Sequence, residues 1–200
     1  MTAAYHARLV ELTAARGNLC VGVDPHEPLV RAWGYDYDLV GLERVSRGLV
    51  EAIGDQVAVF KPQAAFFECF GAPGMQVLAR VLADIAQAGA LSILDVKRGD
   101  IGSTMAAYSR AYLSGQTDLT ADAITISPFL GFGSLGPAVE LAHQTGRGLY
   151  VLCRTSNPEG GDVQLAVRDG RSVAQQMVDA AKAANEASGQ HAVGLVIGGT

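Results

Sequence analysis

The stretch LDVKRGDIGST, residues 94–104, places four charged side chains within seven positions, directly after an apolar run. The run itself, LSILDVK (91–97), is apolar almost without interruption, which is typical of a strand covered on both faces, as in a parallel sheet. Asp95 and Lys97 are two positions apart, so on a strand we expect both side chains to point to the same side. Asp100 comes just beyond the strand, in a loop that leads to a helix.

The same pattern of a short apolar run, a loop and a helical stretch repeats along the chain. The six runs cover residues 19–24, 57–62, 91–97, 123–128, 148–155 and 193–200. Helices are expected near 39–53, 73–88, 103–113, 134–145 and 171–187, with C-terminal caps at Gly54, Gly89, Gly146 and Gly189. A further helix before the first strand would begin at a Thr2 cap and end at Gly17.

Six strand–helix repeats predict an α/β fold, either an open doubly wound sheet or a closed (β/α)8 barrel. Polar residues at the C-terminal ends of four different strands favour the TIM barrel, because an open sheet concentrates its site at one switch point. These residues are Asp24, Lys61, Asp95, Lys97 and Ser127. A complete barrel typically has about 250 residues. We therefore expect residues 1–200 to form one barrel domain, truncated at the C-terminus, with the first six strand–helix units.

Composition excludes several classes of protein. The formal net charge is −5 and no basic block occurs, which argues against nucleic acid as a partner. The N-terminus is charged throughout, unlike a signal peptide, and no uncharged apolar run is long enough to span a membrane. Cys20, Cys69 and Cys153 are widely spaced, which predicts reduced, buried thiols in a cytoplasmic protein. The four histidines are scattered without ligand spacing, which predicts surface positions.

The charged residues at the strand ends form an array of mixed sign. Asp24, Lys61, Asp95, Lys97 and Asp100 carry three negative and two positive charges, and alternation of sign keeps each group ionised. A lysine between two aspartates is a poor Schiff-base nucleophile, which needs a depressed pKa. It is well suited to give a proton to a developing carbanion. The alternative is a network of salt bridges that only closes the mouth of the barrel.

At this point the sequence resembles a known family. LDVKRGDIGST is similar to the D-x-K-x-x-D-I-x-x-T signature of orotidine 5′-phosphate decarboxylases. VGVDP looks like the family's first-strand aspartate motif, FKPQ like its second-strand lysine motif and RTSNPEG like its fifth-strand serine motif. ADAITISPFLGFGS and VGLVIGGT resemble the fourth and sixth strands of the longer-chain subgroup common in actinobacteria.

The resemblance implies a decarboxylation of orotidine 5′-phosphate to UMP that uses no metal and no organic cofactor. Lys97 would donate the proton to C6 of the pyrimidine, and Asp95 would lie against the departing carboxylate and hold Lys97. Lys61 would bridge the ribose hydroxyls and Asp95. Asp24 would bind the ribose, and Ser156 would form a hydrogen bond with the edge of the pyrimidine.

The resemblance also implies a homodimer with shared active sites. Asp100 and Thr104 would enter the site of the other subunit, beside Ile101. The family's phosphate grip comes from a loop after the seventh strand and an arginine at the eighth, and the 200 residues include neither.

Two other functions stay open from the residues. D-x-K-x-x-D also occurs in related lyases that act on keto-sugar phosphates with Mg²⁺, and the fold could instead serve as a non-catalytic nucleotide-binding barrel. GFGSLG (131–136) matches the dinucleotide motif G-x-G-x-x-G, but Pro137 follows at once and no acidic residue ends a later strand, so we expect a flexible loop capped by Ser134. Two roles stay open for Ser127, which are to line the pocket or to cap a turn before Pro128. We expect Arg154 to form an ion pair, either at the surface or with a residue that supports the site, rather than to contact the substrate.

Overall fold

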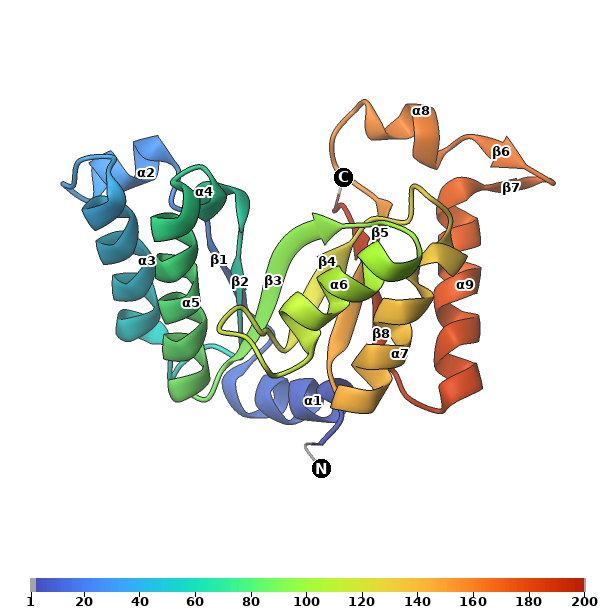
Figure 1. Cartoon of the computed structure of the whole chain (residues 1–200), viewed down its shortest axis with the longest axis horizontal. Helices are drawn as coiled ribbons and strands as arrows, with labels where there is room; N and C mark the ends of the chain where they lie inside the picture. Colours follow the sequence, from blue (N-terminus) through green and yellow to red (C-terminus); the bar gives the residue numbers. More distant parts are fainter. Residues whose placement is uncertain (1–2, 200) are drawn as a thin grey trace. The chain divides into compact units, whose positions relative to one another are not determined.

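The computed structural model describes residues 3–199, so the predicted Thr2 cap and the last residue of the predicted sixth strand, Thr200, lie outside the described residues. The chain forms two compact units (Figure 1). The N-terminal unit combines Ala7–Val96 with Gln116–Asp122. Among the described residues, the C-terminal unit combines Lys97–Gly115 with residues 123–199 and 3–6.

In the N-terminal unit, strands β1 (Cys20–Val23), β2 (Val59–Pro62) and β3 (Leu91–Arg98) pair in parallel in that order. The last two residues of β3 belong to the other unit. Helices α3 (Leu39–Ile53) and α5 (Gly71–Gln87) lie side by side in this unit (Figure 1). The unit also includes α2 (Glu27–Ala32), α4 (Ala65–Glu68) and most of α1 (Tyr5–Arg16). All three strands run the same way, so their C-terminal ends lie at one edge of this sheet.

In the C-terminal unit, strands β4 (Ala123–Ile126), β5 (Gly148–Arg154) and β8 (Val193–Ile197) pair in parallel in that order. Helices α6 (Gly102–Leu113) and α7 (Gly136–Thr145) pack against each other, and α9 (Val173–Ser188) packs on β5 and β8 (Figure 1). A 3-10 turn, η1 (Phe132–Leu135), precedes α7. After β5 come α8 (Gly160–Gln164) and the antiparallel hairpin of β6 (Val167–Arg168) and β7 (Arg171–Ser172).

Burial follows the expected pattern in both units. All four residues of β4 are buried, as are the first six of β3, which is why these strands read as continuous apolar runs. Helices α3 and α5 bury one face each. The residues of those faces include Leu42, Val45, Val50, Val77, Leu78, Val81 and Ile85.

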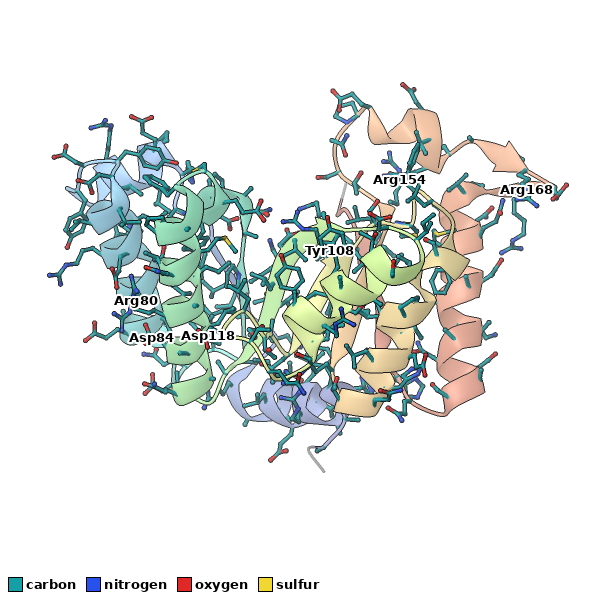
Figure 2. All side chains as sticks on the ribbon, in the orientation of Figure 1. Arg80, Asp84, Tyr108, Asp118, Arg154 and Arg168 are labelled. Atoms are coloured by element: carbon teal, nitrogen blue, oxygen red, sulfur yellow. The ribbon has the colours of Figure 1, made fainter. Side chains whose placement is uncertain are left out.

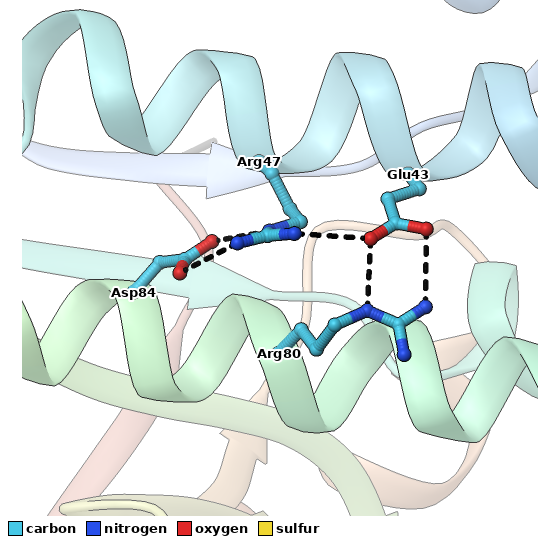
Figure 3. A network of polar contacts seen from close by, with 4 residues as sticks. All are labelled: Glu43, Arg47, Arg80 and Asp84. Carbon is cyan, nitrogen blue, oxygen red and sulfur yellow. Dashed lines mark hydrogen bonds and ion pairs between the residues drawn. The ribbon is translucent and has the colours of Figure 1, made fainter.

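Charged side chains join α3 to α5 on the outer surface (Figure 3). The Arg80 guanidinium donates to both carboxylate oxygens of Glu43, at 2.8 and 3.0 Å, and holds the pKa of Glu43 below its usual value. Arg47 donates to Asp84 at 2.6 and 3.1 Å and to Glu43 at 3.1 Å. The side chains are partly exposed, so each pair stabilises the packing only modestly.

Helix α1 is fastened to the N-terminal unit by two arginines. Arg8 pairs with Asp122 at 2.5 Å, and Asp122 in turn accepts hydrogen bonds from the backbone N–H and the hydroxyl of Ser92. Arg16 donates to the carbonyls of Gly54 and Ala88, which follow the last turns of α3 and α5. A cation at two helix C-termini satisfies carbonyl groups that the helices leave without partners.

The predicted α/β alternation is confirmed. All six predicted strands and all five predicted main helices are present, with ends that differ by at most three residues. Gly146 and Gly189 cap their helices in the left-handed conformation, and Gly17 ends α1 at φ 81°. Gly54 instead keeps right-handed helical geometry, and its role is packing, since a Cβ there would lie 2.5 Å from the Val50 carbonyl oxygen.

Some expectations were wrong. Cys20 and Cys69 are exposed, because one lies on the end strand of its sheet and the other caps the short helix α4. Only Cys153 matches the predicted burial among the three free thiols. His143, predicted at the surface, is half-buried on α7. The short elements α2, α4, α8 and the β6–β7 hairpin carried too little periodicity to be predicted. Within residues 3–199, no helix is long and apolar enough to cross a membrane.

Candidate active site

The best-defined part of the predicted array is an ion pair between two neighbouring strands. The ammonium group of Lys61, on β2, lies 3.0 Å from Oδ2 of Asp95, on β3. The Asp95 side chain is only 8% exposed and that of Lys61 is 34% exposed. A buried carboxylate is stable when ionised only if donors replace its water. Lys61 supplies one such donor and remains partly exposed.

Gln63 supplies a second donor that the sequence did not reveal. Its side-chain amide donates to the same Oδ2 of Asp95, at 3.0 Å. Its backbone N–H donates to the carbonyl of Val23, and it forms a parallel bridge with Asp95. The available signal was its spacing, since residues 61 and 63 lie on one side of a strand. Gln63 thus ties the ends of β1, β2 and β3 together.

Asp24 follows β1 at the same edge of the N-terminal unit. Its carboxylate turns back over the strand, so that a Cβ on Gly22 would lie 2.3 Å from Oδ2 and would displace the carboxylate. Gly22, two residues before Asp24, pairs in register with Lys61 on β2. The structure therefore gathers Asp24, Lys61 and Asp95 at one edge.

Lys97 lies at the end of β3, two residues beyond Asp95, and is exposed. Its backbone has φ 45°, in the left-handed region that residues with a side chain rarely adopt. Regular strand alternation, on which the prediction of its direction rested, therefore ends at Lys97. Its N–H donates to Oγ1 of Thr125 on β4 at 3.0 Å, within the C-terminal unit.

The loop after β3 carries Asp100, Ile101 and Thr104. Asp100 accepts a hydrogen bond from the N–H of Ile101 at 2.8 Å, at the start of α6. Ile101 is 62% exposed, and Thr104, in the first turn of α6, is also exposed. The neighbouring Arg98 lies over the ring of Tyr108, 5.7 Å from its centroid. Of the three predicted residues, Ile101 and Thr104 are thus exposed and Asp100 is half-buried.

The loops after β4 and β5 hold the remaining candidates. The N–H of Ser127 donates to the Arg98 carbonyl at 2.8 Å, so Ser127 joins the end of β4 to the end of β3. Ser156 is exposed, and its backbone lies within 3.0 Å of where a Cβ on Gly198 would be. Arg154, labelled in Figure 2, donates to two neutral oxygens, the Thr155 carbonyl and Oε1 of Gln164, rather than to a carboxylate.

Two other features do not form a site. Among residues 3–199, no three His, Cys, Asp or Glu side chains cluster as metal ligands would. A groove of about 1080 Å³ runs along α3, where Tyr35, Val40 and Arg44 contribute to its wall. The groove lies among the helices, and the charged side chains of Glu43, Arg47 and Asp84 on its wall form ion pairs with one another.

GFGSLG does not have the geometry of a dinucleotide loop. Residues 132–135 form the 3-10 turn η1, and the Ser134 hydroxyl donates to the Gly131 carbonyl at 2.7 Å. The hydroxyl therefore closes this turn within the loop, whereas the N-cap of α7 is Leu135.

Comparison with known proteins shows the family to which the chain belongs. Residues 17–200 match the model of the orotidine 5′-phosphate decarboxylase / HUMPS family. Orotidine 5′-phosphate decarboxylase of Streptomyces coelicolor is 53% identical over 200 residues, which are 98% of this chain and 71% of the relative. The enzyme of the same name from Salinispora tropica is 52% identical over 198 residues, again 98% and 71%.

The chain belongs to the orotidine 5′-phosphate decarboxylase family.

Solved structures give the same result for the fold of this decarboxylase family member. A crystal structure from Streptomyces avermitilis matches with a TM-score of 0.97 and 54% identity, over 100% of this chain and 70% of that one. Leishmania donovani OMP decarboxylase matches with a TM-score of 0.82 and 34% identity, over 98% and 71%. The predicted class, a (β/α)8 TIM barrel represented by six strand–helix units, is confirmed.

Proposed function

We propose that this chain decarboxylates orotidine 5′-phosphate to UMP and carbon dioxide, a step of pyrimidine biosynthesis, with Lys97 as the proton donor. Membership of the decarboxylase family supports the reaction, and the relatives from Streptomyces coelicolor, Salinispora tropica and Salinispora arenicola, at 53%, 52% and 51% identity, carry the decarboxylase name rather than that of a keto-sugar-phosphate lyase. The observation that carries the proposal is the buried Asp95 carboxylate held by Lys61 at 3.0 Å, two residues from Lys97 on the same strand.

Decarboxylation at C6 requires fixed charges and a nearby proton donor. Breaking the bond between C6 and the carboxylate leaves an electron pair on C6 that the pyrimidine ring cannot delocalise well. The Lys97 ammonium group donates its proton to that pair, and the resulting amine regains a proton from water. Preorganised charges around a developing anion commonly contribute about 2.7 to 4 kcal/mol each. No organic cofactor and no metal takes part in this proposal.

The remaining side chains bind and orient the substrate. Asp95 lies against the departing carboxylate, and Lys61 bridges Asp95 and the ribose hydroxyls. Asp24 binds the ribose, and Ser156 forms a hydrogen bond with the edge of the pyrimidine. The pairing of Gly22 with Lys61, two residues before Asp24, supports a shared ribose site at this edge. The partial exposure of Lys61 supports access of the substrate to its ammonium group.

A homodimer with shared sites is part of the same proposal. Ile101, Phe129 and Leu130 are 62%, 78% and 54% exposed, in loops that begin where Arg98 and Ser127 are hydrogen-bonded. Exposed apolar side chains of this size favour an interface. We propose that a second copy covers them and that Asp100 and Thr104 reach its site from there.

A cytoplasmic location is also proposed. It is supported by the three cysteines, which are free thiols, as is usual in a reducing compartment.

A decarboxylation assay on orotidine 5′-phosphate tests the reaction. Wild type should convert the substrate equally well with and without EDTA. Lys97→Ala should lose the chemical step, by at least about 10² to 10⁴-fold, while it still binds UMP in calorimetry. A Lys97→Ala variant with wild-type turnover removes this lysine from the mechanism, and activity that EDTA abolishes points to the magnesium-dependent lyase chemistry instead.

Mixing two inactive variants tests the shared site. Asp100→Ala and Lys97→Ala should each be nearly inactive. After subunit exchange about half of the dimers are hybrids, each with one intact site, so activity should recover towards about a quarter of wild type. Mixing without exchange is the control. If mass spectrometry shows exchange and activity does not return, Asp100 serves its own subunit.

A further inference from the structure

The backbone of Lys97 adopts a conformation that the chain would not choose by itself. Its φ of 45° brings Cβ close to the backbone carbonyl, which is unfavourable for any residue other than glycine. Lys97 is one of two non-glycine residues with positive φ among residues 3–199, and the other, Asp169, lies in the tip of the β6–β7 hairpin. Such a conformation persists only where neighbouring groups hold it. The contacts around Lys97 therefore matter.

Three consecutive residues after Val96 contact Thr125 of β4 or Ser127, which follows β4. The Lys97 N–H donates to Oγ1 of Thr125 at 3.0 Å. The Arg98 carbonyl accepts from the Ser127 N–H at 2.8 Å. Gly99 comes so close to β4 that a Cβ would lie 2.3 Å from the Ser127 carbonyl oxygen. Arg98 and Gly99 meet backbone groups of Ser127. Of the three contacts, the one at Lys97 is therefore the hydrogen bond to a side chain, the Thr125 hydroxyl.

Thr125 is an unusual choice for its position. It is 3% exposed, in the centre of the buried strand AITI (123–126), where Ile124 and Ile126 are 0% exposed. A valine would have the same shape and would avoid burying a hydroxyl group. The hydroxyl oxygen is a hydrogen-bond acceptor that valine lacks, and branching at Cβ restricts its χ1 angle. The acceptor is thus aimed in a fixed direction at the Lys97 N–H.

We propose that Thr125 is a positioning residue for Lys97. Its hydroxyl holds the left-handed backbone of Lys97, and this backbone sets the direction in which the ammonium group leaves the strand. A change of φ towards extended values rotates Cβ and moves the proton donor away from C6. The inference rests on the proposed function in so far as Lys97 is the proton donor. Thr125 itself does not touch the substrate.

Thr125→Val and Thr125→Ser form the test pair. Thr125→Val keeps the shape and loses the acceptor, and Thr125→Ser keeps the acceptor and loses a packed methyl group. We expect kcat of Thr125→Val to fall about 10- to 100-fold, since a small misplacement of a catalytic group has effects of this size, with KM within about twofold. We expect kcat of Thr125→Ser to stay within about threefold of wild type. Thr145→Val, which removes a hydroxyl bonded to the Leu141 carbonyl on α7, is the control and should keep wild-type kcat.

A purely structural role would give the opposite order, because the serine variant loses the packed methyl group. If kcat per folded site in Thr125→Val equals that of wild type, or if Thr125→Ser is the more impaired of the two, the inference is wrong.

Amide hydrogen exchange provides a readout that does not need activity. The Lys97 N–H should exchange at least about tenfold faster in Thr125→Val than in wild type and Thr125→Ser, because its acceptor is gone. Unchanged exchange overturns the inference. If wild type lacks decarboxylase activity and the exchange still accelerates, the proposed reaction fails while the hold of Thr125 on Lys97 stands.

Discussion

Replacement of Lys61 by Met should destabilise the protein through Asp95. The substitution removes the ammonium group 3.0 Å from Oδ2 and leaves a carboxylate whose side chain is only 8% exposed. Breaking a fully buried ion pair costs about 3 to 5 kcal/mol, and a lost hydrogen bond to a charged group costs about 1.5 to 3 kcal/mol. Since Gln63 remains a donor and the Lys61 side chain is 34% exposed, we expect the lower range, about 2 kcal/mol.

The assay is thermal and urea unfolding at pH 7. A loss of about 2 kcal/mol corresponds to a decrease in Tm of about 4 to 8 °C for a chain of this length. Arg31→Met is the matched control, because it breaks the exposed pair of Arg31 and Glu27, with side chains 56% and 52% exposed. An exposed pair of this kind contributes less than about 0.5 kcal/mol.

A double variant separates the charge from packing. The double variant Lys61→Met, Asp95→Asn should recover part of the loss, because a neutral amide needs no cation. If Lys61→Met is as stable as Arg31→Met at pH 7, the buried ion pair does not stabilise the fold as argued.

Three other outcomes are expected. Gln63→Met should cost about 1 to 2 kcal/mol in urea unfolding, since Asp95 loses one donor; equal stability would mean that water replaces the amide. A double-mutant cycle of Glu43→Gln and Arg80→Met should give a coupling energy of about 0.5 to 1 kcal/mol that shrinks in high salt, and a value near zero would contradict the pairing in Figure 3. Burial lowers the pKa of His143, whose Nε2 has no partner within residues 3–199, so the unfolded chain takes up the proton first as the pH falls below about 6.5. Stability should therefore decrease below that pH in wild type and less in His143→Gln, and parallel pH curves would show that His143 is not responsible.

Much of the fold could be read from local sequence. Continuous apolar runs ended by polar residues identified all six strands, and glycines after helical stretches identified their ends. Backbone periodicity and the burial of apolar surface act over a few residues, so they leave a trace in the sequence. Asp24, Lys61 and Asp95 could be predicted as a group for the same reason, since parallel strands bring their C-terminal ends to one edge.

Contacts that depend on the third dimension could not be read in this way. Gln63 and Thr125 look like ordinary polar residues, and only the packing of neighbouring strands shows that one holds the Asp95 carboxylate and the other the Lys97 N–H. The exposure of Cys20 and Cys69 depends on which strand ends a sheet and where a short helix turns.

The sequence by itself thus determined the order of strands and helices and the charges at the strand ends, because both follow from local chemistry. Only the tertiary structure decided that Lys97 departs from the extended strand at φ 45°. The physical reason is that a left-handed residue is locally unfavourable. Its stabilisation comes from β4, whose Thr125 lies 28 residues further along the chain.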